Sequence, residues 1–238
     1  MIVAIEGIDG SGKTTIASRL AQKLNMKYIK DPAKKVLNMS TAEYKQLFSD
    51  IEHVHGHATI AQLLTMGYTS LDKTENLICD RHILSNYFHN GNEETLPYFD
   101  AQVKSGDVPD LTFVLCCDKD ERKRRIAERN PHDPDLQKDF DAQDARYDEM
   151  MAYADSRGIP CVEVSSEFIP LDVLVDGLAE VVLALQQSGP LDMAQKREFA
   201  GYADKYLLYK FEQHFAYDAL TQYLIKELPE DDGTEKTK

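Results

Sequence analysis

The sequence predicts an α/β fold in which helices cover both faces of a five-stranded parallel sheet. Five short apolar runs alternate with longer segments of helical periodicity, which is the pattern that strands and crossover helices produce. A glycine-rich turn joins the first apolar run to the first helical segment. With 238 residues, the chain has room for one large domain, or for one domain with an appendage.

Each expected element follows from a local pattern. The first strand is the apolar run Ile2-Val3-Ala4-Ile5, and the first helix follows the glycine turn, with apolar residues at helical spacing up to Leu24. The same reasoning predicts strands at residues 2–6, 27–30, 76–79, 111–116 and 161–164. It predicts helices at residues 13–24, 41–51, 56–73, 82–104 with a break near Gly91, 119–129, 136–157 and 170–187.

The C-terminal part of the chain differs from the rest in composition. Ser188-Gly189-Pro190 interrupts the helical pattern, so we expect a main domain at residues 1–188 and an extension at residues 189–238. Residues 191–228 carry many aromatic side chains three or four positions apart, which predicts one or two amphipathic helices. The acidic end, with Glu230-Asp231-Asp232, is expected to be disordered.

Composition excludes several classes of function. The net charge of −14 disfavours DNA or RNA as a partner, because long polyanions require a basic surface. No apolar run approaches the roughly 20 residues that span a bilayer, and the first residues lack the basic start and cleavage site of a secretion signal. The four cysteines lack metal-ligand spacing. We therefore expect a cytoplasmic protein without a membrane partner, whose thiols are reduced.

Residues 7–14 carry the first functional motif. They read G-x-x-x-x-G-K-T, between a predicted strand and a predicted helix, which is the context of a phosphate-binding loop. Its glycines let successive N–H groups point at an oxyanion, and the helix that follows adds the positive end of its dipole. We expect Lys13 to reach the β- and γ-phosphates of a nucleotide and the Thr14 hydroxyl to ligate Mg²⁺.

A second motif, Asp80-Arg81, stands at the end of the third predicted strand. In a doubly wound sheet, that strand end lies beside the glycine loop. A carboxylate there can hold Mg²⁺ through water, so we expect Asp80 to share the metal with Thr14. The adjacent Arg81 can clamp a phosphate through two parallel N–H bonds.

Two further features belong to the same predicted cleft. Asp31-Pro32 ends the second strand, where a carboxylate can accept from a sugar hydroxyl, although the pair is equally typical of a plain turn. Arg125 and Arg129 lie four residues apart, so they share a helix face next to the loop at residues 130–134. That face is expected to close over phosphates as a lid, which supplies the positive charge that phosphoryl transfer requires; a solvated basic helix face is the alternative.

Three motifs, in this order, resemble those of thymidylate kinases. They are Ile5 to Thr15, Asp80 to Ser85 followed by Asn90-Gly91, and Pro109-Asp110-Leu111 before the arginine-rich helix. The resemblance covers about residues 1–187 and points to the thymidylate kinase and deoxynucleoside kinase group. It implies that residues 1–188 form a P-loop nucleotide kinase domain with strand order 2-3-1-4-5. It also implies ATP and Mg²⁺ as co-substrates and a homodimer.

The resemblance also assigns roles by position. It places Asp9 near the transferred phosphoryl group and Arg125 by the lid, and it assigns Asp80 and Arg81 to metal and phosphate. The residues expected to bind ATP are Gly7, Gly10, Ser11, Gly12, Lys13, Thr14 and Thr15. Those expected near the acceptor are Asp31, Arg81, Ser85, Phe88 and His89, and those expected to act in transfer are Asp9, Lys13, Asp80, Arg81, Arg125 and Arg129.

The chain departs from thymidylate kinases at four places. Lys30-Asp31-Pro32 replaces the usual Arg-Glu-Pro, residues 64–69 lack the arginine that grips the monophosphate, and residues 130–134 lack the lid arginine. Phe88-His89-Asn90 replaces Ala-Tyr-Gln, and the bulky Phe88 is expected to reshape the acceptor wall. Deoxynucleoside kinases place a carboxylate-proline pair after the second strand, where the carboxylate acts as a base toward the 5′-hydroxyl, and Asp31-Pro32 fits that role.

The leading prediction is phosphoryl transfer from ATP to a deoxynucleoside monophosphate, either dTMP or a related nucleotide. Phosphorylation of an unphosphorylated deoxynucleoside is the alternative within the same group. The altered lid and the missing arginines also leave open a non-catalytic protein that binds nucleotides and regulates a partner.

Overall fold

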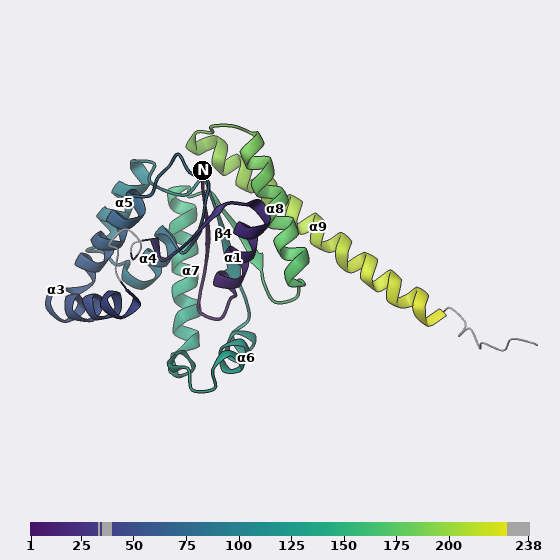
Figure 1. The fold of residues 1–238 in the computed structure, drawn as a ribbon, viewed down its shortest axis with the longest axis horizontal. Coiled ribbons are helices and arrows are strands. Elements are labelled where there is room, and N and C mark those ends of the chain that lie inside the picture. The colour runs from purple at the N-terminus through teal and green to yellow at the C-terminus, as the bar shows by residue number, and fades with distance from the viewer. Residues whose placement is uncertain (33, 35–39, 228–238) are drawn as a thin grey trace, which may run out of the picture.

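Five parallel strands in the order β2-β3-β1-β4-β5 form the sheet in the computed structural model (Figure 1). The structure describes residues 1–32, 34 and 40–227. The strands are β1 (Ile2–Gly7), β2 (Lys27–Lys30), β3 (Leu77–Asp80), β4 (Leu111–Cys116) and β5 (Cys161–Ser165). The helices are α1 (Lys13–Leu24), α3 (Thr41–Thr69), α4 (Ile83–Asn90), α5 (Leu96–Lys104), α6 (Lys119–Arg129), α7 (Phe140–Arg157), α8 (Leu171–Gln187) and α9 (Met193–Glu227), with a short 3₁₀ helix at Pro134–Gln137.

The expected strand order and the break near Gly91 are confirmed. The two helices expected at residues 41–51 and 56–73 meet at a kink at Gly56, whose φ of 71° and ψ of −177° are not helical. Together they make up α3, which ends at Thr69. The helix expected from residue 136 begins at Phe140, because Asp139 caps it by accepting from the backbone N–H of Ala142 at 3.0 Å. The acidic residues 230–232 lie outside the described part of the chain.

Helices cover both faces of the sheet, and each face buries an apolar core. On one face, α1, α8 and the first half of α9 pack against alternate residues of β1, such as Val3 and Ile5. On the other face, α4, α5 and α7 pack around Phe99, Val114 and Tyr153. Because side chains alternate along a strand, Glu6 of β1 points to the α4 side of the sheet. There it accepts a hydrogen bond from the backbone at the start of α4.

Helix α9 is a single helix of 35 residues. Its first half belongs to the core: Ala203, Leu207 and Phe211 are buried, and Gly177 of α8 allows their close approach, since a Cβ there would lie 3.1 Å from Leu207 and Phe211. Its second half extends away from the body of the molecule (Figure 1). The division at residue 188 stays a prediction.

None of the described helices combines the length and the apolar character that a membrane crossing requires.

Candidate active site

The phosphate-binding loop lies between β1 and α1, at the carboxyl end of the sheet. Gly7, Gly10 and Gly12 have φ values of 132°, 84° and 91°, in the region that favours glycine. A Cβ on Gly7 would lie 2.4 Å from the carbonyl oxygen of Leu115, and one on Gly10 would lie 2.9 Å from Cβ of Arg122. The loop therefore needs glycine both for its turn and for its contact with β4 and α6.

Lys13 is buried at the start of α1 and has folded back onto its own loop. Its ammonium group donates to the carbonyl oxygen of Ile8 at 2.6 Å. Burial, together with the nearby Arg81 charge, lowers the pKa of Lys13 to about 7. A phosphate group would offer this cation a stronger partner than a neutral carbonyl.

Thr14 and Asp80 meet as the sequence predicts. The Thr14 hydroxyl donates to Oδ2 of Asp80 at 2.7 Å, and the Tyr28 hydroxyl donates to the same oxygen at 3.1 Å. Within the described part of the chain, Oδ1 of Asp80 is buried and has no hydrogen-bond partner. A hydroxyl beside a carboxylate with an unpartnered oxygen fits Mg²⁺, which keeps several waters and phosphate oxygens as its other ligands. Tyr28 is a contact that the sequence reasoning missed.

Arg81 points into the same site from a strained backbone. Its φ is 81°, which is unusual for a residue with a side chain. The backbone N–H of Arg81 donates to the Ile5 carbonyl at 3.1 Å, and its guanidinium lies 3.1 Å from Oδ1 of Asp9. Ser85, one turn further on, lies 3.5 Å from the guanidinium.

Glu6, which the sequence analysis did not single out, holds this segment in place. It is fully buried and caps the N-terminus of α4 by accepting from the backbone N–H groups of His82, Leu84 and Ser85 at 2.7–3.1 Å. The Ser85 hydroxyl donates to its other oxygen. A buried carboxylate is costly unless donors surround it, and here four donors do. Glu6 thereby couples β1 to the turn that carries Arg81.

Asp9 has two cationic partners. Besides Arg81, Lys138 lies 2.8 Å from Oδ2 of Asp9, although it is 129 residues away in the sequence. Burial alone would raise the pKa of Asp9, but the charge of Lys13, the hydrogen bond from Lys138 and the charge of Arg81 hold that pKa well below its usual range. Lys138 was missed because a single lysine before α7 has no sequence signal.

Arg125 is tied to the loop through Ser166. Its guanidinium donates to the hydroxyl of Ser166 at 3.1 Å and to the carbonyl of Ser166 at 2.7 Å, and that hydroxyl donates to the Ser11 carbonyl at 2.8 Å. A cavity of about 370 Å³ opens beside these groups. It is lined by Gly12, Thr15, Arg124 and Arg125 among others, so it is the space next to the phosphate loop where a nucleotide base and ribose would fit.

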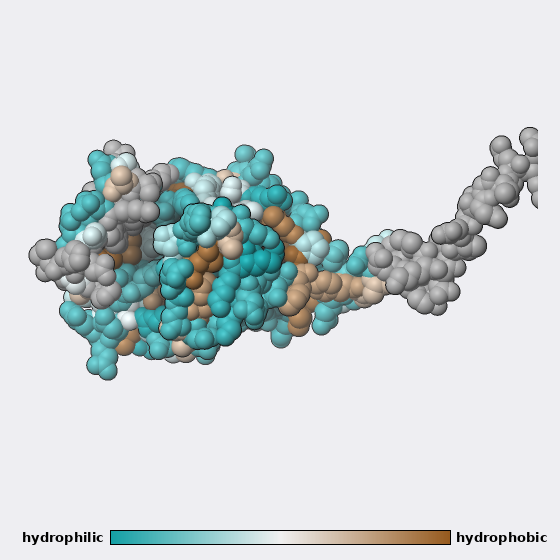
Figure 2. All heavy atoms as spheres, turned by 90° about the horizontal axis from the view of Figure 1, so that it is seen from below, coloured by the Kyte–Doolittle hydropathy of each residue, from teal (hydrophilic) through white to brown (hydrophobic). Residues whose placement is uncertain are grey.

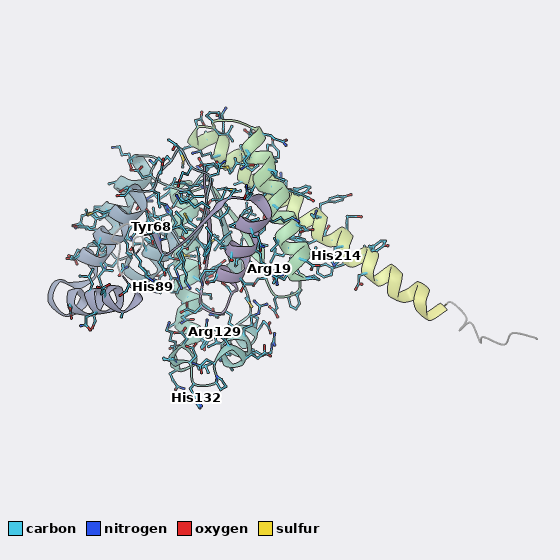
Figure 3. The ribbon with its side chains drawn as sticks, viewed as in Figure 1. Arg19, Tyr68, His89, Arg129, His132 and His214 are labelled. Carbon is cyan, nitrogen blue, oxygen red and sulfur yellow. The ribbon has the colours of Figure 1, made fainter. Side chains whose placement is uncertain are left out.

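Arg129 does not join this group. It lies on the projecting end of α6, near His132 (Figure 3), where its guanidinium pairs with Asp133 at 2.5 Å, and 61% of its side chain is exposed. Arg125 and Arg129 were predicted to share a helix face, but Arg125 contacts Ser166 whereas Arg129 contacts Asp133. A role for Arg129 in transfer stays a prediction.

The residues expected near the acceptor lie on two elements. Asp31, at the end of β2, has φ 46°, and burial raises its pKa although Arg81 opposes the shift. Phe88 and His89 lie near the end of α4, with their rings edge to face at 5.0 Å. Phe88 packs partly into the core while His89 is exposed.

A phosphate loop, a strand-end Asp-Arg pair and the strand order 2-3-1-4-5 define a P-loop kinase fold. Residues 5–167 match the model of the family described as thymidylate kinase. The chain belongs to the thymidylate kinase family, whose members are nucleotide kinases, and the resemblance seen in the sequence is confirmed.

Individual relatives are distant. A probable thymidylate kinase of Archaeoglobus fulgidus is 29% identical over 154 residues, which cover 56% of this chain and 73% of the relative. One of Methanococcus vannielii is 27% identical over 138 residues, covering 52% and 64%.

Among solved structures, deoxyadenosine kinase from M. mycoides with dCMP and dCDP bound has a TM-score of 0.55 at 15% identity, covering 78% of this chain and all of that one. Thymidylate kinase from Candida albicans has a TM-score of 0.50 at 20% identity, covering 78% and 92%. At these identities the likeness supports the fold.

Proposed function

We propose that this protein transfers the γ-phosphoryl group of ATP to a deoxynucleoside monophosphate, with dTMP or a related deoxynucleotide as acceptor. The observation that carries the proposal is the convergence of Lys13, Arg81 and Lys138 around Asp9 at the mouth of the phosphate loop. Phosphoryl transfer depends on positioning and on positive charge around the transferred group, and these three cations supply it.

Each residue of the site has a role in phosphoryl transfer that follows from its position. The loop amides and Lys13 would hold the β- and γ-phosphates. Thr14 with Asp80 would hold Mg²⁺, which would supply further positive charge to the phosphates. Arg125, fixed through Ser166, lies beside the ATP cavity. Asp9 keeps Arg81 and Lys138 in place until phosphate oxygens replace its carboxylate as their partner.

Lys138 is our candidate for the missing lid arginine. Thymidylate kinases usually carry that arginine in the segment that corresponds to residues 130–134, which lacks one here. The ammonium group of Lys138 comes from the same connection between α6 and α7. It brings a point charge rather than a two-pronged guanidinium, so we expect weaker geometric selection of the acceptor phosphate.

Asp31 favours a second candidate, the phosphorylation of a deoxynucleoside at its 5′-hydroxyl. Its carboxylate lies next to Asp80 and Arg81, and its pKa is raised by burial, which suits a general base. A monophosphate acceptor would instead face repulsion from this carboxylate.

A coupled assay of ADP release tests both candidates. It should be run with each deoxynucleoside and each deoxynucleoside monophosphate, with MgATP in excess. We expect one preferred monophosphate. Turnover of nucleosides alone would replace the leading proposal with the second, and calorimetric ATP binding without any turnover would support a non-catalytic role.

A further inference from the structure

A tyrosine on the strand next to β3 contacts the carboxylate that fits the metal. The Tyr28 hydroxyl donates to Oδ2 of Asp80 at 3.1 Å, and the Thr14 hydroxyl donates to the same oxygen at 2.7 Å. Because a carboxylate oxygen has two lone pairs, these two donors fill the acceptor positions of Oδ2. Among residues 1–32, 34 and 40–227, Oδ1 of Asp80 has no hydrogen-bond partner. Oδ1 is therefore the oxygen left for a metal ion or for one of its waters.

The sheet fixes the position of the Tyr28 hydroxyl. β2 and β3 are parallel, and Tyr28 lies opposite Ile78, two residues before Asp80. Since alternate residues of a strand share a face, Tyr28 and Asp80 lie on the face that α1 covers. The tyrosine ring packs against the core there, while its polar tip reaches the carboxylate. Burial and the charge of Asp80 raise the pKa of Tyr28 above its ordinary value, so the hydroxyl remains a donor at neutral pH.

These contacts lie at the carboxyl end of the sheet, which faces the viewer in Figure 2. Hydrophilic residues cover most of this face. Asp80 itself is 2% exposed, so its carboxylate is largely shielded from bulk water. Its hydrogen-bond partners within the protein therefore decide which of its oxygens a bound cation meets.

The number of free oxygens on a carboxylate affects the choice between cations. Mg²⁺ requires a near-ideal octahedron with oxygens at about 2.0–2.1 Å, a geometry that the narrow bite of a chelating carboxylate fits poorly. Ca²⁺ accepts roughly six to eight oxygens at about 2.3–2.6 Å and readily takes both oxygens of one carboxylate. A carboxylate with only one free oxygen therefore suits Mg²⁺ better than Ca²⁺.

We propose that Tyr28 is a positioning residue that makes this site select Mg²⁺ over Ca²⁺, because its hydrogen bond to Oδ2 of Asp80 leaves Oδ1 alone for the metal. Thr14 by itself does not have this effect, since its single hydroxyl hydrogen fills one of the two lone pairs of Oδ2. Without the Tyr28 hydroxyl, Asp80 can turn both oxygens toward a larger cation. This inference rests on the proposed function only in that the phosphate loop binds a metal–nucleotide complex, and it is independent of the acceptor.

Binding of a non-hydrolysable ATP analogue, with an imido group between the β- and γ-phosphates, measures this selectivity without turnover. Isothermal titration calorimetry should be run on the full-length protein with the analogue in excess Mg²⁺, in excess Ca²⁺ and in EDTA. For the wild type, we expect tighter binding with Mg²⁺ than with Ca²⁺. In Tyr28→Phe, the Mg²⁺ complex should bind roughly tenfold more weakly, as is usual when a residue that orients a metal ligand is lost. The Ca²⁺ complex should bind to this variant as tightly as to the wild type, or more tightly.

Tyr147→Phe is the matched control. The Tyr147 hydroxyl donates to Oε1 of Glu163 at 2.8 Å, so this variant also removes a hydrogen bond from a tyrosine to a carboxylate. Glu163 belongs to β5, at the opposite edge of the sheet from β2. We expect both metal complexes to bind Tyr147→Phe within about twofold of the wild type. Circular dichroism and melting temperature check that both variants fold, and binding of the metal-free analogue in EDTA should be the same for all three proteins.

The ratio of the Mg²⁺ to the Ca²⁺ affinity decides the outcome. A fall of at least fivefold in Tyr28→Phe, with no fall in Tyr147→Phe, supports the proposal. Equal weakening of both complexes would show that Tyr28 only supports the fold of the site, and that result, like unchanged affinities, overturns the proposal. So does a wild-type crystal structure with Ca²⁺ and the analogue in which both oxygens of Asp80 contact the metal. A wild type that does not bind the analogue under any of the three conditions would overturn the proposed function as well, whereas the other results leave that function standing.

Discussion

Lys138 and Asp9 form an ion pair in which Nζ lies 2.8 Å from Oδ2, so the segment that precedes α7 reaches the phosphate-binding loop. Lys138 also pairs with Asp135 at 2.8 Å. One cation thus links the segment between α6 and α7 to the phosphate-binding loop.

Replacing Lys138 should slow the reaction without unfolding the protein. A charge-assisted contact contributes about 1.5–3 kcal/mol, so Lys138→Ala should lower kcat/KM by roughly 10- to 100-fold, and Lys138→Arg should restore part of it. Lys119→Ala is the control, since the side chains of Lys119 and Lys138 are both 42% exposed, and Lys119 pairs with the surface residue Asp141 instead of Asp9. Equal effects of the two alanine variants would contradict a specific role for Lys138.

Lys13→Ala should abolish turnover. Lys13 is the cation that the loop itself supplies to the β- and γ-phosphates, and loss of one such charge costs on the order of 10²–10³ in kcat or more. Single-turnover kinetics measure the transfer step itself, and a melting curve tests the fold. Retention of more than a tenth of the wild-type rate would exclude this loop as the site of transfer.

Thr14→Ala should raise the Mg²⁺ concentration at half-maximal rate about tenfold, because Mg²⁺ would lose one of its two protein oxygens. Thr14→Ser keeps the hydroxyl and should behave like the wild type. A magnesium titration at saturating ATP measures the difference. If both variants titrate like the wild type, Thr14 does not contact the metal.

Asp31→Asn should separate the two acceptor classes. If Asp31 is a general base toward a 5′-hydroxyl, the amide lowers kcat for nucleosides by 10²- to 10⁴-fold. If the acceptor is a monophosphate, removing the negative charge mainly lowers KM for it. Comparing kcat and KM for the preferred acceptor of the wild type decides between these outcomes.

Acid should destabilise the fold through His82, which is 1% exposed and stacks on Tyr68 with ring centroids 4.5 Å apart. Burial lowers its pKa from 6.5 to about 3; the charge of Asp107 opposes this shift to a smaller extent, and the charge of Lys73 adds to it. Below pH 6.5, His82 therefore binds a proton in the unfolded chain but not in the folded protein. The free energy of unfolding consequently falls as the pH falls. The loss amounts to about 2 kcal/mol at pH 5.

Urea unfolding at pH 8, 6 and 5 measures this slope. His82→Phe retains an aromatic ring against Tyr68 and should lose that part of the pH dependence. His132→Phe, at an exposed position in the loop after α6, should leave the slope unchanged. Parallel profiles for the wild type and His82→Phe would show that His82 does not stay neutral in the fold.

The local sequence determined the strand and helix pattern, the strand-loop-helix at residues 2–24, and the residue types of the loop. These are short-range features, because hydrophobic period and glycine placement act over a few neighbours. The pairing of Thr14 with Asp80 was also predictable, since parallel strands end at one edge and the two motifs follow neighbouring strands.

Only the tertiary structure decided which of the other partners meet. Lys138 reaches Asp9, Glu6 caps α4, and Arg125 binds Ser166 while Arg129 turns to Asp133. The same is true of α9, whose aromatic residues were visible in the sequence but whose division into a buried and an exposed face depends on α8. Such contacts depend on how whole elements pack against one another, and no periodicity within a single element encodes the direction of its neighbour.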